Sequence, residues 1–169
     1  MQYPIYDLTI MPMLRMLKNL DDIVREAETY QKADTNIEES AIVQARLFPN
    51  MRPFVFQIQA ATDTAKGAAA RLAGKSVPAW SDNEKTFAEL HERLNKAISY
   101  LSEFEASDFA SADEREIELK PAPDSYKLIG KDYISWFAMP NFYFHATTAY
   151  NILRANGVDV GKGSYLGKV

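Results

Sequence analysis

The sequence predicts an all-α protein: a single domain over residues 1–169, built as an up-down four-helix bundle with a short β-hairpin between its third and fourth helices. Two observations support this class. Apolar residues recur at three- and four-residue steps in four long segments, as they do along one face of an amphipathic helix. The breaks between these segments are short and marked by proline or glycine, and no linker divides the chain.

The first helix is predicted over residues 8–30, where six apolar residues form one stripe. These residues are Met13, Leu14, Leu17, Leu20, Val24 and Ala27. Pro12 fits this helix if it lies in the first turn, where a missing N–H leaves no helical bond unmade. After this helix, Asn36 is expected to cap a short helix over residues 37–44.

The second helix is predicted to open at Pro53 and to end before Gly74, because proline favours the first turn of a helix and glycine the position after its end. Its stripe consists of Phe54, Ile58, Ala61, Ala65, Ala69 and Leu72. The third helix is predicted to start at Ser81, since Ser81 and Glu84 match a capping box. Its stripe consists of Phe87, Leu90, Leu94, Ile98 and Leu101.

Residues 115–129 change to a period of two, which is typical of strands. Ile117 and Leu119 alternate with charged neighbours, and Tyr126 and Leu128 repeat the pattern after the turn-forming residues 121–124. This alternation predicts the hairpin between the third and fourth helices.

The fourth helix is predicted over residues 132–156, with Gly157 as its C-terminal cap and Pro140 as a kink or a break. Its aromatic residues point to every side, and a helix that is apolar all round needs to be covered. We therefore expect a homodimer interface on this helix. The tail over residues 158–169 reads as irregular.

Composition narrows the classes of function. The net charge of −4 argues against a nucleic-acid partner, because an acidic surface repels phosphate backbones. The chain has no cysteine, which removes disulfides, thiolate nucleophiles and cysteine-ligated metal sites. No signal peptide and no apolar run long enough to cross a membrane are seen, so we expect a cytoplasmic protein without a membrane partner.

A polar pocket is predicted between the second and fourth helices. Asn141, His145 and Thr148 share one face of the fourth helix at helical spacing. Gln59 and Asp63 belong to a polar strip on the second helix. A polar strip on a helix that also faces a core indicates either a pocket for a small molecule or an internal hydrogen-bond network that stabilises the fold.

A divalent metal is the alternative occupant of this pocket, with His145 and Asp63 as its ligands. Asn141, one turn before His145, is a weaker ligand because its amide is neutral. His91 falls off the apolar stripe of the third helix and reads as a solvated surface histidine. Arg46 and Arg52 flank the start of the second helix, where they could bind an anion.

Four stretches of the chain resemble a bacterial family of unknown function that is related to the DinB-like metalloenzyme four-helix bundles. The stretches are residues 6–8 (YDL), 59–74 (QAATDTAKGAAARLAG), 128–133 (LIGKDY) and 140–150 (PNFYFHATTAY). The resemblance covers nearly the whole chain. It implies a bundle that is usually dimeric.

In DinB-like proteins, three histidines bind a divalent metal: one on the second helix and a pair four residues apart on the fourth. On this resemblance His145 matches the second histidine of the pair, Asn141 the first, and a position near Gln59 the histidine of the second helix. The pocket residues and the resemblance together leave three functions open. The first is a bundle that is non-catalytic or binds a small molecule in the polar pocket. The second, implied by the resemblance, is a metal-dependent thiol transferase or hydrolase with a degenerate site, and the third is a dimeric stress or scaffold protein that works through its surface.

Overall fold

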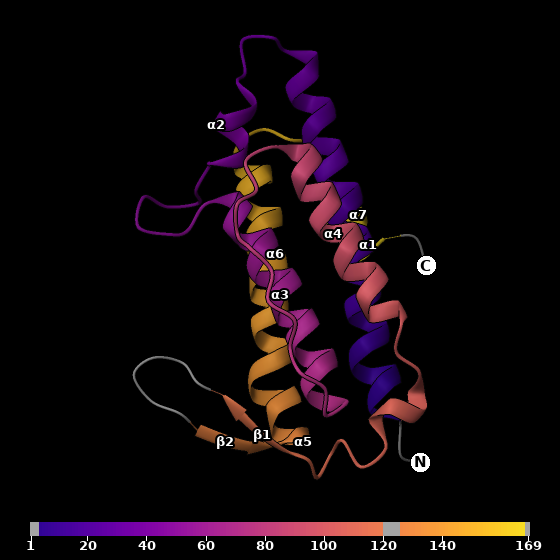
Figure 1. The fold of residues 1–169 in the computed structure, drawn as a ribbon. Helices are drawn as coiled ribbons and strands as arrows, with labels where there is room; N and C mark the ends of the chain where they lie inside the picture. Colours follow the sequence, from indigo (N-terminus) through magenta and orange to yellow (C-terminus); the bar gives the residue numbers. More distant parts are fainter. Residues whose placement is uncertain (1–3, 120–125, 168–169) are drawn as a thin grey trace.

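Four long helices lie side by side in the structure, a computed structural model that describes residues 4–119 and 126–167 (Figure 1). They are α1 (Ile5–Ala33), α3 (Phe54–Leu72), α4 (Phe87–Ser102) and α6 (Met139–Ala155). A two-stranded hairpin lies at one end of the bundle. The predicted fold class, a helical bundle with one hairpin, is confirmed.

The directions of the helices break a strict up-down alternation at one connection. After α3, residues 73–86 return along the bundle as an extended segment, so that α3 and α4 run the same way and α1 and α6 run the other (Figure 1). Both α3 and α4 begin beside α2 (Glu39–Val43). There the N–H of Phe87 donates to Glu39 Oε1 at 2.5 Å, and the N–H of Phe54 donates to the carbonyl of Ala45.

The core lies between the four helices and is built from the predicted stripes. All six stripe residues of α1 and all six of α3 are buried, and of the five on α4 Ile98 alone is half-buried. Each fully buried aliphatic or aromatic side chain stabilises the fold by about 1.5–3 kcal/mol relative to an exposed one. Hydrophobic burial along α3 therefore fixes which side of this helix is left for polar contacts.

Helix α1 starts earlier than the sequence predicts. It begins at Ile5, so Pro12 lies inside the helix and not in its first turn. Tertiary packing explains the extension: Ile10 and Thr9 are fully buried, and the ring of Tyr6 packs on that of Phe109 with centroids 5.6 Å apart. These contacts outweigh the one backbone hydrogen bond that proline removes.

The predicted cap of α4 was wrong by five residues. The helix begins after Thr86, whose Oγ1 accepts from the N–H of Glu89 while the Glu89 carboxylate accepts from the N–H of Thr86. Two Ser/Thr-x-x-Glu patterns compete in this stretch. The one at Ser81 does not cap because Glu84 binds other side chains, as described below.

The short helix α2 also starts later than predicted. Its N-cap residue is Glu38, without a side-chain cap, and the side chain of Asn36 instead bonds the carboxylate of Asp34. The Asp34 carboxylate also accepts from the backbone N–H of Asn36, and this local Asx turn competes with capping by Asn36.

The hairpin pairs β1 (Glu116–Leu119) with β2 (Tyr126–Ile129) in antiparallel register, with Ile117 opposite Leu128. Ile117 and Leu119 are buried, as the alternation predicts. The turn predicted at residues 121–124 lies outside the described residues.

The fourth helical region is continuous from the hairpin to its cap. A short turn, α5 (Gly130–Asp132), leads into a π-helical segment, η2 (Tyr133–Ala138), and then into α6. Pro140 does not split the helix. The N–H of Met139 closes the last π turn on the carbonyl of Ile134, so the change from π to α register falls directly before the proline. Gly157 has a φ of +89° and ends α6 as predicted.

The tail is not wholly irregular, contrary to the prediction. A helical turn, α7 (Lys162–Leu166), packs on α1, where Asn19 Nδ2 donates to the carbonyl of Tyr165 at 2.9 Å. This turn depends on tertiary contacts because five residues are too few for an isolated helix. Within the described part of the chain, no helix is long and apolar enough to cross a membrane.

Candidate functional site

Polar side chains of α3 face two different neighbours. Gln59, Asp63 and Lys66, at steps of four and three residues, face the extended segment and α4. Gln57 and Thr64 contact α6. The residues that the sequence assigns to one pocket therefore make their hydrogen bonds in two directions: Gln59 and Asp63 bond Glu84 and Arg93, whereas Asn141 and His145 bond Thr64 and Gln57.

The first side is a charge cluster centred on Arg93 of α4, whose side chain is 2% exposed. Its Nη2 lies 2.9 Å from Asp63 and 2.8 Å from Asp82, and its Nη1 lies 2.9 Å from Glu84. We call Arg93 with these three carboxylates the Arg93 clamp. Because Asp82 and Glu84 belong to the extended segment, the clamp fastens that segment to α3 and α4.

The remaining groups of the clamp are also satisfied. Arg93 Nε donates to Thr62 Oγ1 at 2.7 Å, and Gln59 Nε2 donates to Glu84 at 2.8 Å. Lys66 lies 2.7 Å from Asp63. Burial disfavours the charged form of Glu84, but hydrogen bonds from Arg93 and Gln59 outweigh it, so the pKa of Glu84 lies below its usual value.

On the other side of α3, His145 is held by an amide. Its Nδ1 lies 2.8 Å from Gln57 Oε1, and Gln57 Nε2 donates to the carbonyl of Arg52 at 3.0 Å. The oxygen of Gln57 therefore accepts, and the neutral imidazole carries its proton on Nδ1. Burial lowers the pKa of His145, because the charged ring loses solvation between the rings of Phe56 and Phe144.

Asn141 and Thr148 differ in their surroundings. Asn141 Nδ2 donates to Thr64 Oγ1 at 2.8 Å across the contact between α6 and α3. Thr148 is buried, and its hydroxyl donates to the carbonyl of Phe144 within its own helix at 2.7 Å. Thr148 thus satisfies its own polar group and presents nothing to a pocket.

A groove of about 300 Å³ lies between α3 and α6. We call it the α3–α6 groove; it is lined by Phe56, Gln59, Ala60, Asp63, Thr64, Arg71, Asp82, Phe137 and Asn141. Three residues of the predicted pocket, Gln59, Asp63 and Asn141, line it. His145 and Thr148 do not.

Two larger hollows lie elsewhere and contain none of the predicted residues. One of about 690 Å³ runs between α1 and the C-terminal tail, where Asp22, Glu26 and Asp159 make its wall acidic. One of about 410 Å³ lies on the outer side of the Arg93 clamp, beside Trp80 and Lys96. Size alone does not choose among them. The α3–α6 groove is distinguished by the guanidinium of Arg71 on its wall.

The predicted metal ligands do not come together. Asp63 belongs to the Arg93 clamp and His145 is bound to Gln57, on different sides of α3. Among residues 4–119 and 126–167, no three His, Asp or Glu side chains are arranged to hold a metal ion.

The position implied by the resemblance also shifts by two residues, since Gln57 and not Gln59 contacts His145. Gln57, Asn141 and His145 then offer one imidazole and two neutral amides. Amides are weak ligands for transition metals. This donor set does not fit the three-histidine site of DinB-like enzymes.

His91 is not a solvated surface residue, contrary to the prediction. Its side chain is 17% exposed, and its Nδ1 lies 2.5 Å from Asp21 of α1. Glu28 lies 3.7 Å from its other ring nitrogen. The residue lies on the flank of the α4 stripe, and that flank packs on polar residues of α1.

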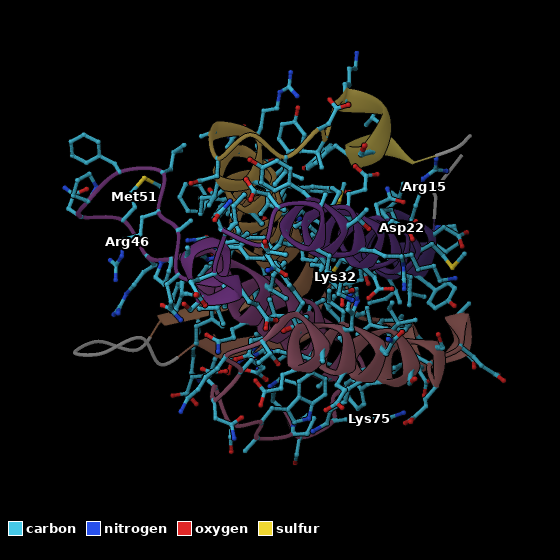
Figure 2. All side chains as sticks on the ribbon, turned by 90° about the horizontal axis from the view of Figure 1, so that it is seen from above. Arg15, Asp22, Lys32, Arg46, Met51 and Lys75 are labelled. Carbon is cyan, nitrogen blue, oxygen red and sulfur yellow. The ribbon has the colours of Figure 1, made fainter. Side chains whose placement is uncertain are left out.

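Arg46 and Arg52 do not form a joint anion site. Figure 2 shows the loop that carries Arg46 and Met51 projecting from the side of the bundle. Arg46 Nη1 donates to the carbonyl of Met51 at 2.6 Å, and the guanidinium of Arg52 lies 5.2 Å from the centre of the Phe56 ring. Arg46 therefore stabilises the loop, and Arg52 packs on the first turn of α3.

Four residues of the Arg93 clamp and of the contact between α3 and α6 are not predicted from the sequence: Gln57, Thr64, Arg71 and Arg93. Arg71 has a readable signal, because Gly67 stands one turn before it and long helical side chains reach back toward the N-terminus. Arg93 interrupts the apolar flank between Leu90 and Leu94, which indicates a buried charge that needs partners. The other two carry no signal in a single sequence.

Comparison with known proteins places the chain in a family. Residues 5–166 match the family described as a domain of unknown function, DUF1993. The chain belongs to this family. A crystal structure of a DinB family member protein from Shewanella denitrificans is 40% identical, with a TM-score of 0.90 over 97% of this chain and 92% of that one. A search of curated proteins finds no match. The chain is thus a DinB-like bundle of a family whose function is unknown.

Proposed function

We propose that this DUF1993 protein binds a small organic molecule in the α3–α6 groove. The observation that carries the proposal is the composition of the groove wall. Phe56 and Phe137 supply apolar surface, while Asn141 and Arg71 supply polar groups with hydrogen-bonding capacity left over. Ligand pockets combine apolar walls with a few convergent polar groups in this way, and about 300 Å³ is the lower end of their usual size.

A fragment screen by NMR on ¹⁵N-labelled full-length protein tests this function. Fragments that bind should shift the backbone amides of Ala60, Thr64, Phe137 and Asn141 together. Asn141→Leu should weaken the binding of those fragments, and Asn36→Leu, on the α1–α2 turn, should not. A screen in which no fragment shifts these four amides would overturn the proposal.

The metal-dependent enzyme is the weaker candidate, because its three-histidine site is reduced here to His145 and two amides. Elemental analysis of protein purified without a metal-affinity tag checks this. Stoichiometric divalent metal that His145→Ala removes would restore the enzyme hypothesis.

We also propose that the protein is a homodimer that pairs through the aromatic surface of η2 and α6. Trp136 is 69% exposed and Phe144 is 57% exposed, and large exposed aromatics are typical of interface anchors. Light scattering should give twice the mass of the 19.1 kDa chain, and Trp136→Glu together with Phe144→Glu should return it to a monomer. A wild-type monomer at micromolar concentration would contradict the pairing.

A further inference from the structure

The charges on the wall of the α3–α6 groove are unequally satisfied. Asp63 and Asp82 are both paired with Arg93. Arg71 is half-buried, and the polar contact made by its guanidinium among the described residues is a 3.4 Å hydrogen bond from Nη1 to the hydroxyl of Tyr133. No carboxylate lies within ion-pair distance of it in residues 4–119 and 126–167. Arg71 is therefore the charge on this wall without a counter-ion.

A glycine makes room for this guanidinium. A Cβ on Gly67 would overlap Arg71 Nη1, and no other residue lies as close to that position. Glycine inside a helix lowers helix stability by about 0.8–1 kcal/mol relative to alanine, so its presence in the middle of α3 has a local disadvantage. The open space over Gly67 allows Arg71 to fold back along α3 into the groove.

The opposite wall is irregular at the same level. Tyr133 and Phe137 belong to the π-helical segment η2, and π turns occur mostly at functional positions. Burial raises the pKa of the Tyr133 hydroxyl above its usual value, so Tyr133 stays neutral and leaves the positive charge of Arg71 uncompensated.

A second donor, the side-chain amide of Asn141, lines the same groove. Thr64 is three residues from Gly67, about 4.5 Å along the helix axis. The hydroxyl of Thr64 donates to the carbonyl of Ala60 and accepts from Asn141, which positions the Asn141 amide and leaves its second N–H to donate. A cation and an amide donor that line one groove suit the oxygens of one acidic group.

We propose that the α3–α6 groove binds an organic oxyanion, a carboxylate or phosphate monoester with a small apolar body. Arg71 binds the charged group, Asn141 donates to it, and Phe56 and Phe137 contact the apolar body. A guanidinium presents parallel donors that match the oxygens of a carboxylate or phosphate. This inference rests on the proposed function and names the class of ligand for the same groove.

The test uses four probes that share a phenyl ring: phenylacetate, phenyl phosphate, the neutral phenylacetamide and the cation phenethylamine. Each is titrated into ¹⁵N-labelled full-length protein and followed by NMR at the amides of Thr64, Phe137 and Asn141. At least one anion should bind tenfold or more tightly than phenylacetamide. Which of the two anions binds better tells whether the acidic group is a carboxylate or a phosphate.

Two variants test the role of Arg71. Arg71→Met removes the charge, and Gly67→Ala leaves the arginine in place but displaces its guanidinium. Both should reduce the affinity for the anion to that for phenylacetamide. Arg154→Met is the charge-matched control, since Arg154 is exposed and pairs with Asp159 at the far end of α6; it should bind like the wild type.

The outcomes separate this inference from the proposed function. If phenylacetamide or phenethylamine shifts the groove amides as strongly as the anions do, or if Arg71→Met leaves anion binding intact, the anion inference is wrong and the groove remains a binding site. If no probe shifts the groove amides, both proposals fail.

Discussion

The two sides of α3 differ in how their charges are satisfied. On the side of α4, three carboxylates surround Arg93, and Lys66 and Gln59 complete the cluster. On the side of α6, Arg71 lies half-buried beside a tyrosine hydroxyl and an open groove.

A charge cluster whose ion pairs are all made within the chain and a charged side chain with donors left over serve different purposes. Buried groups whose bonds are all made within the chain hold elements together and have little left to offer a ligand. A charge with bonding capacity left over, placed on a groove wall, is a candidate for recognition. We infer that the Arg93 clamp is structural and that the α3–α6 groove is the functional side.

The largest expected effect is that of removing the charge from the clamp. Arg93→Met leaves Asp63, Asp82 and Glu84 close together without their cation. Breaking a fully buried ion pair destabilises a protein by about 3–5 kcal/mol, and because water screens the partly exposed Asp63 and Asp82, the loss here should be below that range but well above that of a surface variant. Urea denaturation measures the loss. Arg71→Met is the control and should change the free energy of unfolding by less than about 1 kcal/mol. Equal losses in the two variants would erase the distinction between the two sides.

Removing the bond that crosses the groove should have a smaller effect. Thr64→Val keeps the shape of the side chain but removes the hydroxyl that accepts from Asn141, at an expected loss of about 1 kcal/mol. The same variant should weaken anion binding, because the Asn141 amide is no longer positioned. If stability falls while anion affinity stays unchanged, Asn141 has no part in binding.

Gly67→Ala should raise stability and lower binding at once. Alanine favours the helix by about 0.8–1 kcal/mol, and the atom that its Cβ meets is the end of a flexible side chain that can move into solvent. Urea denaturation and an anion titration on the same sample measure both effects. A variant that is less stable than the wild type would show that the space over Gly67 serves packing and not recognition.

The smallest expected effect is the pH dependence that His145 contributes. An unfolded imidazole has a pKa of about 6.5, and burial lowers the pKa of His145 below that in the native state. As the pH falls through about 6.5, the unfolded chain takes up a proton that the native state does not, so the free energy of unfolding decreases toward acid pH.

Denaturation of the wild type and of His145→Gln between pH 7.5 and pH 5 measures this contribution. His91 and the carboxylates are present in both proteins, so their effects cancel in the difference. The wild type should lose more stability than the variant over this range. Parallel curves would show that the solvation of His145 does not change on unfolding.

Much of the fold follows from the sequence because burial repeats along each helix. The stripes of α1, α3 and α4, the hairpin and the glycine at the end of α6 all depend on local periodicity or on one backbone angle. The start of α4, the helical tail and the position of Pro12 depend on contacts between distant segments. Ser81 and Thr86 offer two capping signals five residues apart. The local pattern cannot choose between them, because it does not show that Glu84 binds Gln59 and Arg93.

The site is harder to predict because it depends on the rotation of a helix. Successive residues turn by about 100°, so an error of two residues moves a side chain to nearly the opposite face. Gln59 and Gln57 illustrate this, since the first donates to Glu84 of the Arg93 clamp and the second binds His145. Asn141 of α6 bonds Thr64 of α3. The sequence does not show that the Asp63 carboxylate, which lines the same groove, is bound to Arg93 of α4.

The most direct test of the account is a map of where small anions bind on the wild-type protein. Phenylacetate and phenyl phosphate are added to ¹⁵N-labelled full-length chain, and the shifts of all assigned amides are compared. The account predicts that the largest shifts lie at Thr64, Gly67, Phe137 and Asn141, with little change at Glu92 and Lys96 on the outer side of the clamp. Largest shifts along α4, or along the acidic hollow beside Asp22, would contradict it.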